Sequence, residues 1–193
     1  MNIYLVRHGQ TTGDIENRYG GDYDDHLTDL GKQQSEGVAR KLADKNIGII
    51  YCSPKIRAKE TAEIVRRTIN IPLTTIDNFR ERNRYGILTG LTKEEAKQKF
   101  PDQVLLLADE HSTVAEGEDY NSFGIRIREA LQKIDTGKYS TAAVVTHGGP
   151  IRYIFREILK EGEIEIGDCA YANISVANDS YILHEVDGVK LNT

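Results

Sequence analysis

Three short apolar runs, each followed at once by polar residues, dominate the pattern of the chain. They cover residues 3–6, 47–52 and 141–146. Uninterrupted apolar runs of this length are typical of strands that are buried on both faces of a parallel sheet. A further strand is expected at residues 72–77. The pattern therefore predicts a buried sheet whose strands end in polar loops.

Segments with helical spacing of apolar residues separate these strands. Thr28 is placed to cap the first of them, and Thr92 and Glu95 have the spacing of a capping box. Ser53 is the expected N-cap of another helix, with Pro54 as its first residue. The spacing predicts helices over 29–45, from 54 onward, over 92–100, over 119–134 and over 150–160.

The last part of the chain has the pattern of a hairpin. Residues 171–177 and 181–186 are rich in strand-forming side chains, and Asn178 and Asp179 between them favour a tight turn. Strands that alternate with helices and then end in a hairpin indicate an α/β domain with a largely parallel sheet. We expect one domain over residues 1–193.

Composition narrows the function classes. The formal net charge of −5 argues against a general nucleic-acid or acidic-membrane surface, so an anion site would have to be a local cationic pocket. The N-terminus lacks the pattern of a signal peptide, no run is long enough to span a membrane, and the two cysteines form no CxxC pair. We therefore expect a cytoplasmic protein without a disulfide or a metal site.

Arginine and histidine residues lie at or just after the carboxyl ends of three of the predicted strands. Arg7 and His8 end the first, Arg57 lies just after the second, and His147 and Gly148 follow residues 141–146. Parallel strands bring their carboxyl ends to one edge of a sheet, where ligands bind. Two guanidiniums, two imidazoles and glycine-containing turns form a set that suits a phosphoryl group.

Each residue type has a place in metal-free phosphoryl transfer. One histidine can attack phosphorus as a neutral nucleophile, while the other histidine and the arginines stabilise the transferring oxygens. Glu81 is the candidate acid for the leaving oxygen and then base for water. A metal site is the rival interpretation of the histidine pair, although two neighbouring arginines disfavour it. A solvated charge cluster is the alternative for Glu81, which lies among arginines.

Five segments together resemble the histidine phosphatase superfamily, also called the phosphoglycerate-mutase-like family. They are LVRHGQT (5–11), HLTDLGKQQ (26–34), CSPKIRAKETA (52–62), EGEDYNSFGIR (116–126) and VTHGGPIR (145–152). The resemblance implies a three-layer α/β/α sandwich that needs no metal or cofactor. It implies that His8 is phosphorylated, that Arg7 and Arg57 bind phosphate, and that His147 is the second histidine.

The chain departs from the family pattern at two catalytic positions. Asp14 stands where the family commonly has a phosphate-binding asparagine. A carboxylate there would repel phosphate unless Arg18 or another cation neutralises it, so a contact with a substrate hydroxyl is the alternative role for Asp14. Glu81 matches the family acid when the alignment runs forward from the preceding strand. An alignment that runs back from Tyr85 points to Arg82 instead.

The resemblance extends to two enzyme classes. ENRYGG (16–21) and RYGILTGLTK (84–93) are similar to the phosphoglycerate mutases, which implies substrate contacts at Gly20, Gly21, Tyr85 and Lys93. Residues 101–116 contain no arginine or lysine, whereas the mutases carry an arginine pair in a longer segment there. A short cover favours water entry, so we expect a phosphatase that acts on a small phosphorylated metabolite. A mutase is the alternative, and a binding module without activity is a third.

Two expectations concern the wider surroundings of this pocket. Arg82, Arg84 and Lys93 are candidates for binding a second anionic group, with solvent-facing charge as the equal alternative. The C-terminal hairpin offers an edge for pairing with a second copy, which would make a homodimer.

Overall fold

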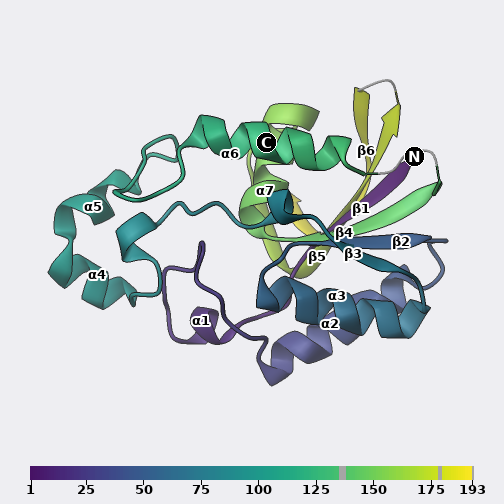
Figure 1. Ribbon diagram of the computed structural model, residues 1–193, viewed down its shortest axis with the longest axis horizontal. Coiled ribbons are helices and arrows are strands. Elements are labelled where there is room, and N and C mark those ends of the chain that lie inside the picture. The colour runs from purple at the N-terminus through teal and green to yellow at the C-terminus, as the bar shows by residue number, and fades with distance from the viewer. Residues whose placement is uncertain (135–137, 178–179, 193) are drawn as a thin grey trace.

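The computed structural model describes residues 1–134, 138–177 and 180–192, and a six-stranded sheet runs through its centre (Figure 1). The strand order is β3-β2-β4-β1-β5-β6. This mixed α/β arrangement confirms the expected fold class. The parallel part consists of β1 (Asn2–Arg7), β2 (Ile49–Cys52), β3 (Leu73–Thr75) and β4 (Thr141–Thr146).

Strand β1 lies in the interior of the sheet and fixes the position of the polar residues that follow it. It pairs in parallel with β4, and Arg7 is in register with Thr146. The backbone N–H of His8 donates to the carbonyl of Thr146 at 3.0 Å. The residues that follow these two strands, His8 and His147, are therefore neighbours although they are far apart in sequence.

Two helical layers cover the sheet, one on each face (Figure 1). Helices α2 (Asp29–Leu42) and α3 (Ile56–Ile69) pack on one face, and α6 (Tyr120–Gln132) and α7 (Gly148–Tyr153) lie on the other. Alternate residues of β1 face opposite layers, as in any strand. Ile3 and Leu5 join the core under α6, while Tyr4 and Val6 join the core under α2 and α3.

The C-terminal strands are longer than the pattern predicted. Strands β5 (Ile164–Ala177) and β6 (Ser180–Leu191) form an antiparallel pair, and β5 also pairs with β1. The register of the pair shifts between Ile166 and Tyr171, where glycine and a left-handed Cys169 interrupt the strand pattern. The expected turn residues, Asn178 and Asp179, lie outside the described residues.

Short elements outside the sandwich form a cover beside the carboxyl ends of the strands. They are α1 (Thr12–Ile15), the 3-10 helices Asp77–Phe79 and Gly86–Leu88, α4 (Lys93–Lys99) and α5 (Pro101–Leu106). The capping box of Thr92 and Glu95 is present as expected. Pro101 does more than end the preceding helix, because proline fits the first turn of a helix and here begins α5.

Two helices begin at residues other than those expected. Helix α3 starts at Ile56, because the Asp24 side chain accepts the Ile56 N–H at 2.7 Å and Ser53 is not its cap. Helix α7 starts at Gly148 directly after β4, two residues before Pro150. It continues as a π-helix over Ile154–Leu159, which apolar spacing alone does not distinguish from an α-helix.

No helix in the described part of the chain has the length and apolar character needed to cross a bilayer.

Close backbone contact between α2 and the loop after β1 gives a test of this packing. A Cβ on Gly31 would overlap the Gln10 carbonyl, whereas a Cβ on Gly37 in the same helix would meet nothing within 4 Å. We expect Gly31→Ala to lower the free energy of unfolding by about 1–3 kcal/mol, as overpacking does. We expect Gly37→Ala to raise it by up to about 1 kcal/mol through helix propensity. Chemical denaturation checks both, and equal effects of the two substitutions would contradict this packing.

Candidate active site

A pocket of about 280 Å³ opens at the carboxyl ends of the parallel strands. The first 21 residues contribute Arg7, His8, Asp14, Gly20 and Gly21 to its lining. Later elements contribute Arg57, Glu81, Tyr85, Lys93 and Gly148. The structure thus brings these ten sequence-derived candidates together around one cavity. The eleventh, His147, is fully buried directly beside His8.

His8 is held in the orientation that a nitrogen nucleophile requires. Its Nδ1 lies 2.8 Å from the carbonyl oxygen of Gly9. A carbonyl can only accept, so Nδ1 carries the proton and Nε2 keeps its lone pair. The Nε–H of Arg57 donates to this Nε2 at 3.2 Å. Arg57 thus contacts the unprotonated Nε2 of His8 and stabilises this tautomer.

Both buried imidazoles are held in the neutral form. Burial is the largest cause that holds the pKa of His8 well below its ordinary value of 6.5, and the charges of Arg57 and Arg7 add to it. Burial also lowers the pKa of His147 well below that value, followed by the charge of Arg57. A neutral His8 is available for attack across the physiological pH range.

Arg57 is almost completely buried, and three acceptors besides His8 satisfy its guanidinium. Nη1 donates to the carbonyl of Tyr23 at 2.6 Å and pairs with the buried Asp25 carboxylate at 3.0 Å. Nη2 donates to the carbonyl of Gly21 at 3.1 Å. The loop over residues 21–25 therefore positions the arginine that touches His8.

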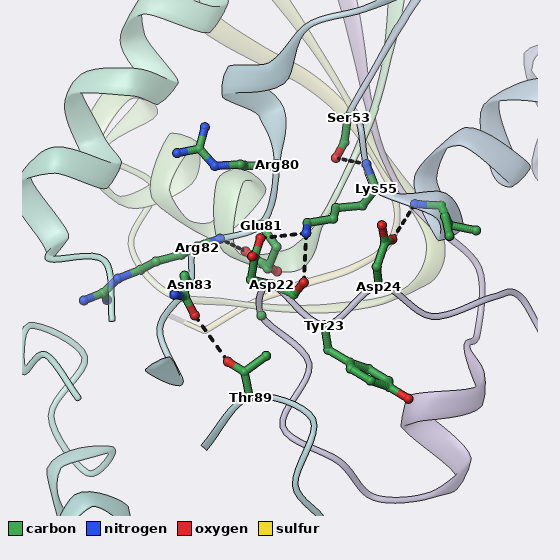
Figure 2. A network of polar contacts seen from close by, with 12 residues as sticks. Asp22, Tyr23, Asp24, Ser53, Lys55, Arg80, Glu81, Arg82, Asn83 and Thr89 are labelled. Carbon is green, nitrogen blue, oxygen red and sulfur yellow. Dashed lines mark hydrogen bonds and ion pairs between the residues drawn. The ribbon is translucent and has the colours of Figure 1, made fainter. Parts of the chain in front are cut away.

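Figure 2 shows how the same loop is fastened to the turn after β2. The Nζ of Lys55 lies 2.6 Å from the carboxylate of Asp22, and it also donates to the Asp22 carbonyl at 2.8 Å. Two residues further, Asp24 accepts the N–H that opens α3. Aspartates at alternate positions of this loop therefore tie it to α3, which carries Arg57.

Two nitrogens of the Arg7 guanidinium have partners, and the third has none among the described residues. Its Nη1 donates to the carbonyl of Ile166 at 2.7 Å, and its Nη2 lies 3.2 Å from the carboxylate of Asp168. Its Nε is buried and has no hydrogen-bond partner in the described structure. A donor left unpaired in a buried position is costly, so this Nε–H is available to an anion in the pocket.

His147 has one engaged nitrogen and one without a partner. Its Nε2 lies 2.7 Å from Oγ of Ser53, and its Nδ1 is buried with no partner among the described residues. The rings of His147 and His8 meet edge to face, with centroids 5.0 Å apart. Ser53 thus orients the second histidine, and its Oγ also accepts the N–H of Lys55 at 3.2 Å rather than capping α3.

Glu81, which follows the 3-10 helix Asp77–Phe79, lines the pocket. Its Oε1 accepts the N–H of Arg82 at 2.8 Å, and its Oε2 accepts the N–H of Gly149 at 3.1 Å. A Cβ on Gly149 would overlap the Glu81 carboxylate, so glycine there allows the close approach. Glu81 thus lines the pocket, whereas Arg82, the residue that the other alignment selects, is not part of its lining.

Arg82 and Arg84 do not serve the pocket, which corrects the expectation for them. Arg82 is buried and donates to the carbonyls of Glu118 at 3.0 Å and Glu110 at 2.6 Å. Figure 2 shows its side chain extended away from Glu81. Arg84 donates to the carbonyl of Leu107 at 2.8 Å. Both guanidiniums donate to backbone carbonyls within residues 107–118, and a sequence pattern does not predict such pairs.

Asp14 lies at the third position of α1 and forms a capping box with Thr11. Its Oδ2 accepts both the backbone N–H and the hydroxyl of Thr11 at 2.9 Å. The position that commonly holds an amide donor therefore presents a carboxylate that stabilises the start of α1. This capping role was not expected, although Thr11 and Asp14 have the spacing that signals it.

Other pocket residues were missed by the sequence analysis. Asp25 was overlooked because it is one of three aspartates in a polar loop, and only the structure shows which one is buried. Arg152 lines the pocket one helical turn after Gly148. Its four-residue spacing from Gly148 was the available signal. In the described part of the chain, no group of three or more potential metal ligands is arranged to hold a metal ion.

Comparison with known proteins points to one family. Residues 3–191 match the model of the histidine phosphatase superfamily (branch 1). The uncharacterized phosphatase PhoE of Bacillus subtilis is 29% identical over 177 residues, covering 91% of this chain and 86% of that protein. A 2,3-bisphosphoglycerate-dependent phosphoglycerate mutase of Chelativorans is 30% identical over 161 residues, covering 78% of this chain and 77% of that protein. The structure of Bacillus stearothermophilus YhfR superposes with a TM-score of 0.83 at 27% identity, covering 97% and 96% of the two chains.

The lowered pKa values of the two pocket histidines predict a pH dependence of stability. Below about pH 6.5 the unfolded chain takes up protons that the folded state refuses, so stability is lost as the pH falls. We expect the free energy of unfolding to drop by roughly 1 kcal/mol for each histidine between about pH 6.5 and 5.5. Denaturation at several pH values checks this in the wild type, in His8→Gln and in the exposed control His184→Gln. A His8→Gln profile as steep as that of the control would contradict it.

Proposed function

Because the chain belongs to the histidine phosphatase superfamily (branch 1), we propose that it is a metal-independent phosphatase for a small phosphomonoester. The reaction runs through a phosphohistidine on His8. One observation carries the proposal: the unprotonated Nε2 of a neutral, buried His8 is in direct contact with Arg57, and the same site holds the unpartnered Nε–H of Arg7 and the unpartnered Nδ1 of His147.

The first step transfers the phosphoryl group to the protein. The Nε2 lone pair of His8 attacks phosphorus in line, and the ester P–O bond breaks as the P–N bond forms. Arg57 shifts its Nε–H from His8 to a phosphoryl oxygen. The free Nε–H of Arg7 and the proton of His147 Nδ1 bind the same group of oxygens. These fixed donors stabilise the charge that develops during transfer, without requiring a metal.

Glu81 serves both halves of the reaction. In the first it gives its proton to the leaving alkoxide, which departs as an alcohol. In the second, the resulting carboxylate takes a proton from water as that water attacks the phosphohistidine. The P–N bond breaks, His8 recovers its lone pair and inorganic phosphate leaves. The N–H groups of Arg82 and Gly149 hold the carboxylate in place.

A phosphoglycerate mutase is the second candidate function, because a relative of 30% identity carries that name. Gly20, Gly21, Tyr85 and Lys93 all line the pocket, as the mutase resemblance implies. A mutase must exclude water from its phosphoenzyme while the substrate turns. The cover of this chain is limited to short elements such as α4 and α5 and has no arginine or lysine in residues 101–116, which favours hydrolysis.

The pocket volume of about 280 Å³ fits a small phosphorylated metabolite better than a protein or nucleic acid. We keep the expectation of a cytoplasmic enzyme that binds neither nucleic acid nor membrane. Strand β6 is an edge strand of the sheet, so pairing of two copies there remains our proposal for a homodimer.

The test is phosphate release from a panel of phosphorylated metabolites and an aryl phosphate, with EDTA present throughout. We expect turnover by the wild type and by the exposed control His184→Ala. For His8→Ala we expect a loss of about a thousandfold or more with the fold intact by circular dichroism, because the nucleophile is gone.

Near-normal turnover in His8→Ala would refute the proposal, as would a wild type that EDTA inactivates. If the wild type releases no phosphate from any compound, phosphorus NMR of phosphoglycerates decides between the alternatives. Interconversion of the 2- and 3-phosphates would identify a mutase, and binding without conversion would identify a binding module.

A further inference from the structure

We propose that Arg152, supported by Lys93, forms a second anion-binding site within the pocket, and that the substrate carries a second negatively charged group. This inference rests on the proposed phosphatase function and narrows its substrate to one chemical class. The class is a small phosphomonoester with a carboxylate or another phosphoryl group near the ester.

The first argument is that the other cations lining the pocket already have partners. Each forms an ion pair: Arg7 with Asp168 at 3.2 Å, Arg18 with Glu16 at 2.5 Å and Arg57 with Asp25 at 3.0 Å. These pairs orient the guanidiniums, and in the proposed reaction Arg7 and Arg57 bind the phosphoryl group on His8. None of these three arginines is therefore left for a second anionic group of the substrate.

Arg152 and Lys93 differ from these cations. Both line the pocket, and neither side chain has a hydrogen bond or ion pair with any described residue. The charge of Arg152 acts on Glu163, but the Glu163 carboxylate is bonded to Nε and Nη2 of Arg156 instead. A half-buried guanidinium without a partner in a concave site is a recognition group for an anion.

The surroundings of Arg152 suit such a group. Its Nη1 lies 2.8 Å from where a Cβ of Gly148 would be, so the absence of a side chain at Gly148 gives the guanidinium its place along the pocket wall. Tyr85 lines the same pocket, and burial raises the pKa of its hydroxyl. A protonated tyrosine can donate to an anion beside the arginine.

The remaining acidic groups of the pocket do not compete for Arg152. Asp14 accepts two hydrogen bonds from Thr11. Glu81 accepts hydrogen bonds from two backbone N–H groups, one at each carboxyl oxygen. The uncompensated positive charge of the pocket therefore lies with Arg152 and Lys93, in a protein whose net charge is −5. Arg152 is half-buried, which strengthens its attraction for a substrate anion, whereas Lys93 is exposed and contributes less.

The experiment compares matched substrates: 3-phosphoglycerate, glycerol 3-phosphate, which lacks the carboxylate, and propane-1,3-diol bisphosphate, which replaces it with a phosphoryl group. For the wild type we expect kcat/KM to be about tenfold to a hundredfold higher for at least one doubly anionic substrate than for glycerol 3-phosphate, as for a charge-assisted hydrogen bond. The preferred doubly anionic substrate identifies the second group.

Substitution of Arg152 isolates its part in this preference. We expect Arg152→Gln to reduce the preference to within a few fold of unity, mainly through KM, and Arg152→Lys to keep part of it. Arg40→Gln, an exposed arginine of α2 outside the pocket, is the matched control and should keep the full preference. Lys93→Gln should reduce the preference less than Arg152→Gln does, since a lysine makes no forked contact.

The outcomes separate this inference from the proposed function. If the wild type hydrolyses an aryl phosphate but shows no preference for a second charge, the second site is refuted while the phosphatase stands. If Arg152→Gln weakens glycerol 3-phosphate as much as 3-phosphoglycerate, Arg152 binds the transferred phosphoryl group and the inference is wrong. If the wild type hydrolyses nothing, the proposed function has failed first.

Discussion

The contact between the Nε–H of Arg57 and the Nε2 of His8 is the interaction on which the rest of the site depends. A guanidinium that is buried so deeply needs acceptors for its other N–H groups, and Asp25 together with the carbonyls of Gly21 and Tyr23 supplies them. This requirement fixes the loop over residues 21–25 against α3. It also places the charge of Arg57 beside the buried His8, and burial first and that charge second lower the pKa of the imidazole and keep it neutral.

Most of the fold could be predicted from the apolar pattern, because buried parallel strands leave an unmistakable signal. Strands β1 and β4 follow the pattern closely. The start of α3 could not be predicted, since its cap is Asp24, which is distant in sequence from Ile56. The π-helix at Ile154–Leu159 and the full length of β5 depend on tertiary contacts in the same way.

The candidate site could likewise be predicted only in part. Residues at strand ends, such as His8 and His147, could be identified because topology alone brings them together. The partners of charged side chains could not. Nothing in the sequence distinguishes Arg82 from Arg152. In the structure, Arg82 donates to backbone carbonyls of Glu110 and Glu118, whereas Arg152 lines the pocket. Tertiary packing determines which backbone carbonyl accepts from which arginine, and the local sequence carries no pattern that predicts it.

The most direct test of this account is to locate the phosphoryl group on the protein during turnover. The wild type is mixed with an aryl phosphate, quenched within the first turnover at alkaline pH, which preserves a phosphorus–nitrogen bond, and mapped by peptide mass spectrometry. The account predicts that the phosphoryl group is on His8. A phosphoryl group on another residue, or phosphate release through the first turnover with no modified protein at any quench time, would contradict it.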